Sequence, residues 1–231
     1  MADILLIHGS GHGAWCWHRL IPALAALGHD ATAITLPRHP GVTLADQAQA
    51  ILHALPRPAV LLGHSAAGLP ITAAAEADPA RIRALIYLCA YAPRGGSSVA
   101  SLRREQIRQP LAPALRVDRS TGSYTFDPDQ TGALFYHDCP EEDRTLAAAN
   151  LCPEPIGPQE TPLTLTGRSQ SLPRFYITCT DDRAIPPEDQ GRMAETVPPQ
   201  NRFALPTGHS PFFAAPGALA ARISEIAATL P

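Results

Sequence analysis

The stretch Gly63-His64-Ser65-Ala66-Ala67-Gly68 (GHSAAG) follows an apolar run and opens a series of small residues. It matches the G-x-S-x-G signature of a nucleophile elbow, except that alanine replaces the second glycine. An elbow holds its serine in a strained turn, so the residues two before and two after must be small. Gly63 and Ala67 meet that demand. The stretch therefore predicts a nucleophilic Ser65, and the alternative is a serine that serves as an ordinary helix N-cap.

Outward from this stretch, short apolar runs alternate with longer helical segments, a pattern typical of an α/β fold with a parallel sheet covered by helices. Six strands are predicted, at Ile4–Ile7, Ala31–Leu36, Ala59–Leu62, Leu85–Leu88, Phe175–Cys179 and Arg202–Leu205. Helices are predicted at Trp17–Leu27, Leu44–Leu55, Ala66–Ala77, Pro187–Thr196 and Pro216–Leu230. Pro22 and Pro70 fall inside two of these helices, so each is expected to kink its helix or to move its start.

Residues 93–173 interrupt the alternation with ten of the 25 prolines, a cluster of arginines (Arg103, Arg104 and Arg108) and no clear strand of the main series. We interpret this segment as an inserted cap on a core formed by residues 1–92 and 174–231. A cap at this point of an open α/β sheet lies over the carboxyl ends of the strands, where substrates enter.

A nucleophilic serine needs a base and an orienting acid, which follow it in the chain order Ser, Asp or Glu, His in this kind of sheet. His209 follows the last predicted strand, and Asp181 and Asp182 follow the strand before it. All of these residues are expected at the same edge of the sheet as Ser65. The sequence therefore predicts a catalytic triad, with either aspartate as the acid.

An oxyanion hole would complete such a site, and the backbone N–H of Ala66 is expected to supply one donor. The glycine-rich loop His8–Gly13, after the first strand, is suited to supply the second. The same loop also fits the dinucleotide fingerprint G-x-G-x-x-A, with Arg38 placed to hold an NADP phosphate. A metal site at His8 and His12 is a further alternative, although a glycine-rich loop favours structural histidines.

The amino-acid composition argues against several classes of partner and mechanism. The net charge of −3 gives no reason to expect nucleic acid or an anionic membrane as a partner. All 18 basic residues are arginine, which excludes mechanisms that need a lysine. The five cysteines are scattered and predict neither disulfides nor zinc. The N-terminus carries no signal-peptide pattern, so a cytoplasmic location is expected.

Motifs along most of the chain resemble the α/β-hydrolases of the plant methyl esterase and hydroxynitrile lyase group and their bacterial esterase relatives. These motifs are His8–Trp17, Leu27–His29, Gly63–Ser65, Phe135–Cys139 with Ala147–Leu151, Tyr176–Pro186 and Gly208–His209. The resemblance implies an α/β-hydrolase fold. It also implies Asp182 rather than Asp181 as the acid, and the N–H groups of Ser10 and Ala66 as oxyanion donors.

Members of this group either hydrolyse esters or cleave cyanohydrins, and the lyases use a lysine after the catalytic histidine, where this chain has Ser210. The resemblance therefore favours a serine carboxylesterase acting on a small-molecule ester, with Ser65, His209 and Asp182 as its triad and with no cofactor or metal. A non-catalytic binding protein and a hydroxynitrile lyase are the alternatives. A homodimer is a further hypothesis.

Overall fold

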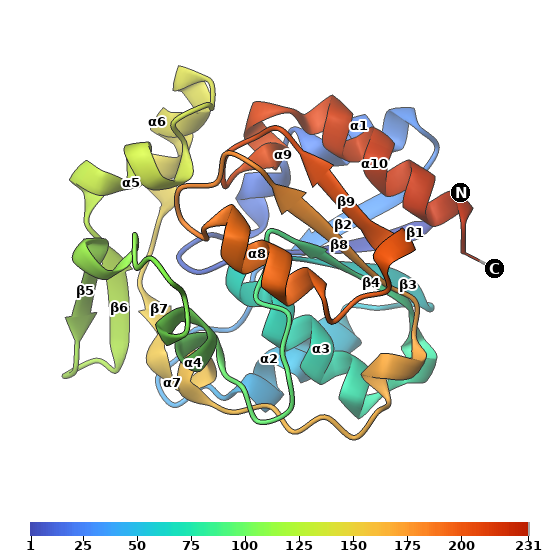
Figure 1. Cartoon of the computed structure of the whole chain (residues 1–231), viewed down its shortest axis with the longest axis horizontal. Helices are drawn as coiled ribbons and strands as arrows, with labels where there is room; N and C mark the ends of the chain where they lie inside the picture. The colour runs from blue at the N-terminus through green and yellow to red at the C-terminus, as the bar shows by residue number, and fades with distance from the viewer. Residues whose placement is uncertain (231) are drawn as a thin grey trace.

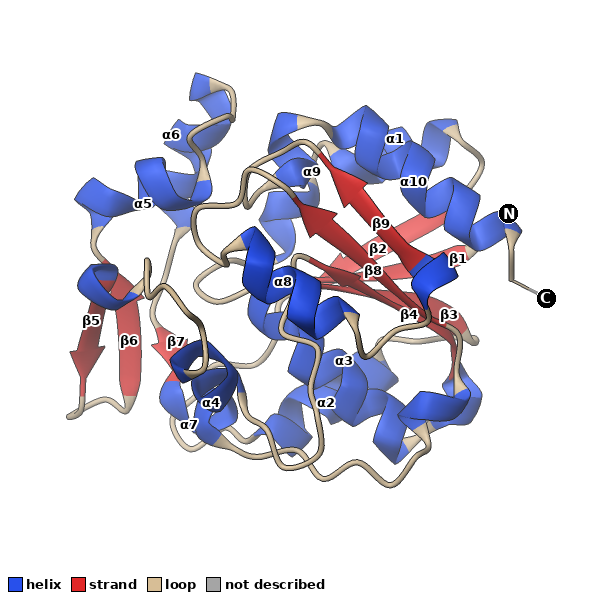
Figure 2. Cartoon of the chain, viewed as in Figure 1, coloured by secondary structure: helices blue, strands red, loops and turns tan. Residues whose placement is uncertain are grey.

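The computed structural model describes residues 1–230 of the chain and contains a six-stranded sheet in the order β2-β1-β3-β4-β8-β9, in which every pairing is parallel. Figures 1 and 2 show this sheet running through the middle of the molecule between two layers of helices. The predicted parallel sheet is confirmed. Its strands are β1 (Asp3–Ile7), β2 (Asp30–Ile34), β3 (Ala59–His64), β4 (Ile82–Leu88), β8 (Arg174–Cys179) and β9 (Arg202–Leu205).

Successive side chains of each central strand face opposite sides of the sheet, so the apolar runs feed two separate cores. Leu5 and Leu61 pack into one core and Leu6 and Leu62 into the other. The first core is covered by α2 (Leu44–His53), α3 (Gly68–Ala77) and α8 (Pro187–Ala194), and the second by α1 (Leu20–Ala26), α9 (Pro211–Ala214) and α10 (Pro216–Ala228). This double burial explains why the strands are continuously apolar in sequence.

Two helices begin later than predicted, and in each case a proline accounts for the start. Pro22 and Pro70 are each the third residue of their helix, α1 and α3. The first turn of a helix has N–H groups without intrahelical acceptors, so a proline there removes no hydrogen bond. The residues before these helices form short 3-10 turns, at Ala14–Trp17 and Ser65–Ala67.

Residues 93–173 lie mostly beside the carboxyl ends of the main strands (Figure 1), whereas their last part runs back along the main core, where Leu163 and Leu172 pack and Ser169 binds Glu76 of α3. They contain the antiparallel strands β5 (Leu115–Asp118), β6 (Ser123–Phe126) and β7 (Glu154–Pro155) in the order β5-β6-β7. Their helices are α4 (Val99–Arg104), α5 (Pro128–Phe135), α6 (Glu141–Asn150) and α7 (Ile156–Glu160). Strand β6 and the segment around α5 cover the edge of the main sheet at which the strands end. The loops that carry the predicted triad residues begin at this edge.

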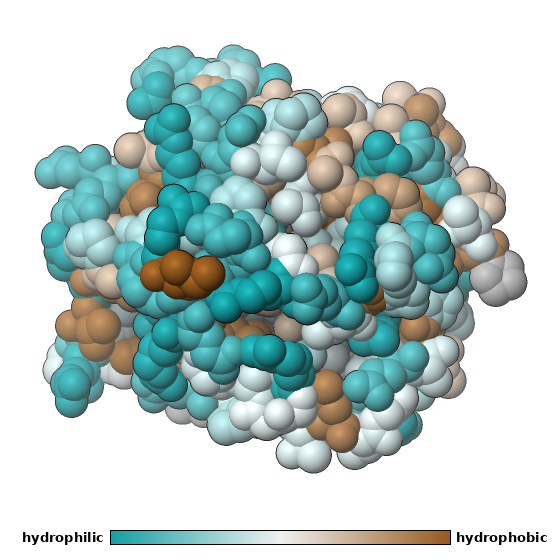
Figure 3. Space-filling model, viewed as in Figure 1, coloured by the Kyte–Doolittle hydropathy of each residue, from teal (hydrophilic) through white to brown (hydrophobic). Residues whose placement is uncertain are grey.

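On the surface shown in Figure 3, hydrophobic residues are scattered among polar ones rather than gathered in one broad patch. Large exposed apolar side chains include Leu27, Ile107 and Val117. Isolated exposed apolar residues are usual on folded proteins. In the described part of the chain, every helix is too short or too polar to cross a bilayer.

Candidate active site

Ser65 lies at the sharp turn between β3 and α3 with a φ of 56°, in the left-handed region that non-glycine residues rarely adopt. Its carbonyl accepts a hydrogen bond of 3.0 Å from the Tyr91 N–H, just beyond the neighbouring strand β4. Cys89, directly after β4, also has a positive φ, of 36°. Strained backbone of this kind persists only where the surrounding structure holds it, and it is concentrated at functional sites. The conformation is that of a nucleophile elbow rather than of an ordinary N-cap.

Steric contacts show which small residues this turn needs. A Cβ on Gly63 would lie 2.9 Å from the Ala67 carbonyl oxygen, so a side chain at position 63 would meet the turn itself. A Cβ on Gly68 would lie 2.2 Å from the Tyr91 carbonyl oxygen. By contrast, Ala67 is 1% exposed and packs in the core beside α2 and α3. The glycine that the close packing requires therefore stands three residues after the serine, and alanine fits at the second position.

The structure brings His209 and Asp182 together with Ser65. His209 Nε2 lies 3.2 Å from Ser65 Oγ, and its Nδ1 lies 2.7 Å from Asp182 Oδ2. An Nδ1–H that donates to the carboxylate leaves Nε2 free to accept the serine proton. These three residues are buried, at 9% exposure or less. This geometry is that of a Ser-His-Asp hydrolase.

Four hydrogen bonds fix the Asp182 carboxylate. Its Oδ1 accepts from the N–H groups of Ala184 (2.7 Å) and Ile185 (2.9 Å), and its Oδ2 accepts from Gln190 Nε2 (2.8 Å) in addition to His209. These hydrogen bonds hold the carboxylate in one orientation towards His209. Asp181 is exposed, and of the two aspartates it is Asp182 whose carboxylate contacts His209. This contact supports Asp182 rather than Asp181 as the orienting acid.

The loop His8–Gly13 packs directly against the elbow. A Cβ on Gly9 would lie 2.8 Å from Ser65 Cβ, so only glycine permits this approach. Ser10 and Ala66 both line the narrow pocket beside Ser65. Within residues 1–230, the Ser10 N–H donates to no protein acceptor, which leaves it available to a ligand.

A buried ion pair from the cap anchors this loop. Glu154 accepts hydrogen bonds from the Gly11 N–H (2.9 Å) and from Arg38 Nε (3.2 Å), and Arg38 also donates to the His12 carbonyl. Burial raises the pKa of the Glu154 carboxyl, against the opposing effect of Arg38. Arg38 and the Gly11 N–H are thus engaged within the protein, and this arrangement contradicts the dinucleotide alternative.

The two loop histidines have structural hydrogen bonds. His8 Nε2 accepts from the Leu36 N–H at 3.0 Å, and His12 Nε2 lies 2.6 Å from the Tyr136 hydroxyl. Burial lowers the pKa of His8 to about 3, aided by the charge of Arg38, and burial lowers that of His12 to about 4. Both imidazoles are therefore neutral near neutral pH, and their nitrogens are engaged in hydrogen bonds within the protein. This is expected for loop histidines with a packing role.

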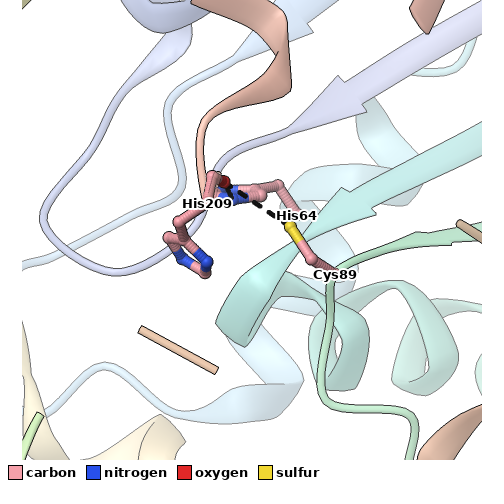
Figure 4. A group of neighbouring side chains, drawn as sticks. All are labelled: His64, Cys89 and His209. Carbon is pink, nitrogen blue, oxygen red and sulfur yellow. Dashed lines mark hydrogen bonds between the residues drawn. The ribbon is translucent and has the colours of Figure 1, made fainter. Parts of the chain in front are cut away.

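The side chains of His64, Cys89 and His209 lie together behind the elbow and offer ligand atoms within 4.8 Å of one another (Figure 4). His64 Nε2 donates to the His209 carbonyl oxygen at 2.8 Å, and Cys89 Sγ approaches the same oxygen at 3.5 Å (Figure 4). Burial raises the pKa of the Cys89 thiol, whereas metals bind the thiolate. Since His209 is also bonded to Asp182 and Ser65, these contacts indicate a support for the His209 loop rather than a metal site.

Cap residues also hold the His209 loop. Asp138 Oδ2 accepts a hydrogen bond of 2.6 Å from the Gly208 N–H, and a Cβ on Gly208 would lie 2.6 Å from Asp138 Oδ1. Next to it, Cys139 Sγ lies 3.8 Å from the Ser210 carbonyl oxygen. The cap therefore contacts the segments on both sides of Ser65: the His8–Gly13 loop through Glu154 and the His209 loop through Asp138.

Ser65 opens into a narrow pocket with about 20 Å³ of free volume, walled by Tyr91, Tyr124, Phe126 and Phe135. An outer cavity of about 1120 Å³ lies under the cap sheet. Val99, Arg103 and Tyr124 line both spaces and so mark their junction. A ligand that reacts at Ser65 has room for a small group beside the serine and for a larger group beyond this junction.

A family model described as "Alpha/beta hydrolase family" matches residues 4–222. The chain belongs to this family. Among curated proteins, this alpha/beta hydrolase is 31% identical to the probable esterase PIR7A of Oryza sativa subsp. indica, over 80% of this chain and 81% of that protein. It is 28% identical to Methylesterase 17 of Arabidopsis thaliana, over 92% of this chain and 86% of that protein. The solved structure of a pyrethroid hydrolase from Sphingobium faniae JZ-2 superposes on this chain with a TM-score of 0.89 at 26% sequence identity. The superposition covers 99% of this chain and 98% of the hydrolase chain.

Several residues that shape this alpha/beta hydrolase site were not predicted from the sequence. Gln190 binds the acid, Glu154 and Asp138 hold the two loops, and Gly68 permits the elbow. Gln190 lies 8 residues after the acid that it binds, and Glu154 binds a loop far away in the chain. Asp138 and Gly68 stand within the motifs Phe135–Cys139 and GHSAAG, but those motifs give no sign of the contacts that the two residues make.

Proposed function

We propose that this protein is a serine carboxylesterase that hydrolyses a small-molecule carboxylic ester through an acyl-enzyme. The observation that carries the proposal is the hydrogen-bonded series Ser65–His209–Asp182 at a strained elbow. The esterase and methylesterase names of the relatives support the same reaction class.

In this mechanism His209 Nε2 takes the proton of Ser65 Oγ as the oxygen attacks the ester carbonyl. The tetrahedral oxyanion accepts hydrogen bonds from the N–H groups of Ser10 and Ala66. His209 then gives the proton to the departing alcohol, and the acyl group stays on Ser65. A water molecule, deprotonated by His209, releases the acid, while Asp182 keeps the imidazole in the productive tautomer throughout.

A fluorophosphonate probe and the ester p-nitrophenyl acetate test the proposal together. We expect a single adduct on Ser65 and hydrolysis that falls by several orders of magnitude in Ser65→Ala. Ser169→Ala, at a buried serine remote from the pocket, serves as the control. Hydrolysis by Ser65→Ala at the parent rate would contradict the assignment, and an unlabelled parent that turns over no ester would favour the binding-protein alternative.

A hydroxynitrile lyase is disfavoured because the chain has no lysine and has Ser210 after His209. Cyanide release from mandelonitrile above the buffer blank would reverse that preference. The cytoplasmic location and the homodimer stay predictions from the sequence.

A further inference from the structure

The arginine cluster of the cap separates in the folded chain into three different environments. Arg108 forms an ion pair with Glu188 at 2.7 Å, and Arg104 is exposed on the surface. Arg103 is partly buried and lines both the narrow pocket beside Ser65 and the outer cavity. One member of the cluster thus stands at the junction through which a substrate reaches the serine.

The Arg103 guanidinium has no hydrogen-bond or ion-pair partner among residues 1–230. The other arginines of the cavity wall differ: Arg38 is paired with Glu154 and Arg116 with Asp127, while Arg119 lies out on the exposed turn after β5. A partly buried guanidinium with five unused donors loses hydration without gaining hydrogen bonds, so it favours a ligand that supplies an anion.

The surroundings of Arg103 offer hydroxyl groups but no carboxylate. Tyr91 and Tyr124 line the narrow pocket together with Arg103. Burial raises the pKa of both phenols, and the Arg103 charge opposes that rise. Among the described residues that line the narrow pocket, none is aspartate or glutamate. In the outer cavity Asp118 is already bonded to the Ser120 N–H at 2.8 Å, and Glu160 is exposed. The charge of Arg103 is therefore left uncompensated within the protein.

Resting on the esterase function proposed above, we infer that the substrate is an ester carrying an anionic group, a carboxylate or a similar oxyanion, which Arg103 binds at the junction of the two cavities. The planar guanidinium can bind a carboxylate through two parallel hydrogen bonds. The small volume beside Ser65 takes the lesser part of the ester, and the anionic part extends into the outer cavity. Arg103 is a specificity residue in this assignment and takes no part in the proton transfers.

Two matched pairs of esters test the inference. 4-Acetoxybenzoate and its methyl ester differ by a carboxylate on the alcohol part, and monomethyl and dimethyl glutarate differ by one on the acyl part. We expect the parent enzyme to prefer the anionic member of at least one pair in kcat/KM. In Arg103→Gln, kcat/KM for that anionic ester should fall about 10- to 100-fold, mainly through KM, while its neutral partner changes less than about threefold.

Arg104→Gln, one residue along the chain, is the matched control and should leave both members of each pair unchanged. Arg103→Lys keeps the charge and should recover part of the preference, and thermal unfolding of each variant shows that the fold is intact. A parent that prefers no anionic ester, or an Arg103→Gln that lowers both members of the preferred pair equally, overturns the inference. Because neutral-ester hydrolysis and Ser65 labelling are measured in the same samples, failure of the esterase function itself would be recognised separately.

Discussion

Ala67 of the elbow leads to a prediction for which the sequence motif and the structure give opposite expectations. The double variant Ala67→Gly/Gly68→Ala restores G-x-S-x-G in the sequence, and a comparison of motifs would expect an intact or improved enzyme. In the structure, a Cβ at position 68 lies 2.2 Å from the Tyr91 carbonyl oxygen and 2.9 Å from its carbon, where ordinary contact begins at 3.4 Å. The backbone must therefore move by about 1 Å at the start of α3.

The magnitude follows from the two changes. The clash is with backbone atoms and cannot be relieved by a rotamer change, so it costs about 3 kcal/mol, and the better helix propensity of alanine returns up to about 1 kcal/mol. Ala67→Gly removes a methyl group that is buried in the core and costs about 1 to 2 kcal/mol. For a chain of this size, about 2 to 4 °C of Tm correspond to each kcal/mol. We expect Tm to fall by about 4 to 8 °C in Gly68→Ala and further in the double variant.

Thermal unfolding by circular dichroism measures the stability, and kcat for p-nitrophenyl acetate reports on the turn, because the Tyr91 N–H is bonded to the Ser65 carbonyl. Gly191→Ala in α8 is the control, since a Cβ there meets nothing within 4 Å. It should leave Tm equal or slightly raised. A double variant as stable and as active as the parent would refute the steric reasoning.

Three further results are expected. Asp182→Asn should lower kcat about 10⁴-fold whereas the exposed Asp181→Asn should change it little, and the reverse ranking would contradict the hydrogen-bond geometry. Gly9→Ala should lower kcat about 10- to 100-fold with a smaller effect on KM, because the added methyl displaces the loop from Ser65; an unchanged kcat would argue against a role for that approach. Burial holds the pKa of His8 near 3 and of His12 near 4, and lowers that of His64, so below about pH 6.5 the unfolded chain takes up protons that the folded chain does not. Stability should therefore be fully present above pH 6.5 and fall by about 1.4 kcal/mol per pH unit for each of these histidines on acidification towards pH 4. In denaturant titrations His12→Gln should reduce this slope, and an unchanged slope would contradict the role of its burial.

The sheet and the order of the site residues could be predicted because both depend on local patterns. Each central strand is buried on both faces and so is continuously apolar, and the loops that follow parallel strands must meet at one edge. That rule alone predicted that Ser65 and His209, which are 144 residues apart, lie together. The helix starts at Leu20 and Gly68 were predicted less well, since each depends on where a proline can be tolerated.

The remaining features depend on contacts that have no local pattern in the chain. The residues around Ser65 are enough to predict that the strand before it ends in a turn with small flanking residues. They do not predict that Gly68, rather than position 67, faces the Tyr91 carbonyl, or that Arg103, unlike Arg104 and Arg108, lines the pocket without a partner. A turn depends on its own residues, whereas a steric limit or an unpaired charge depends on the distant segment that folds beside it.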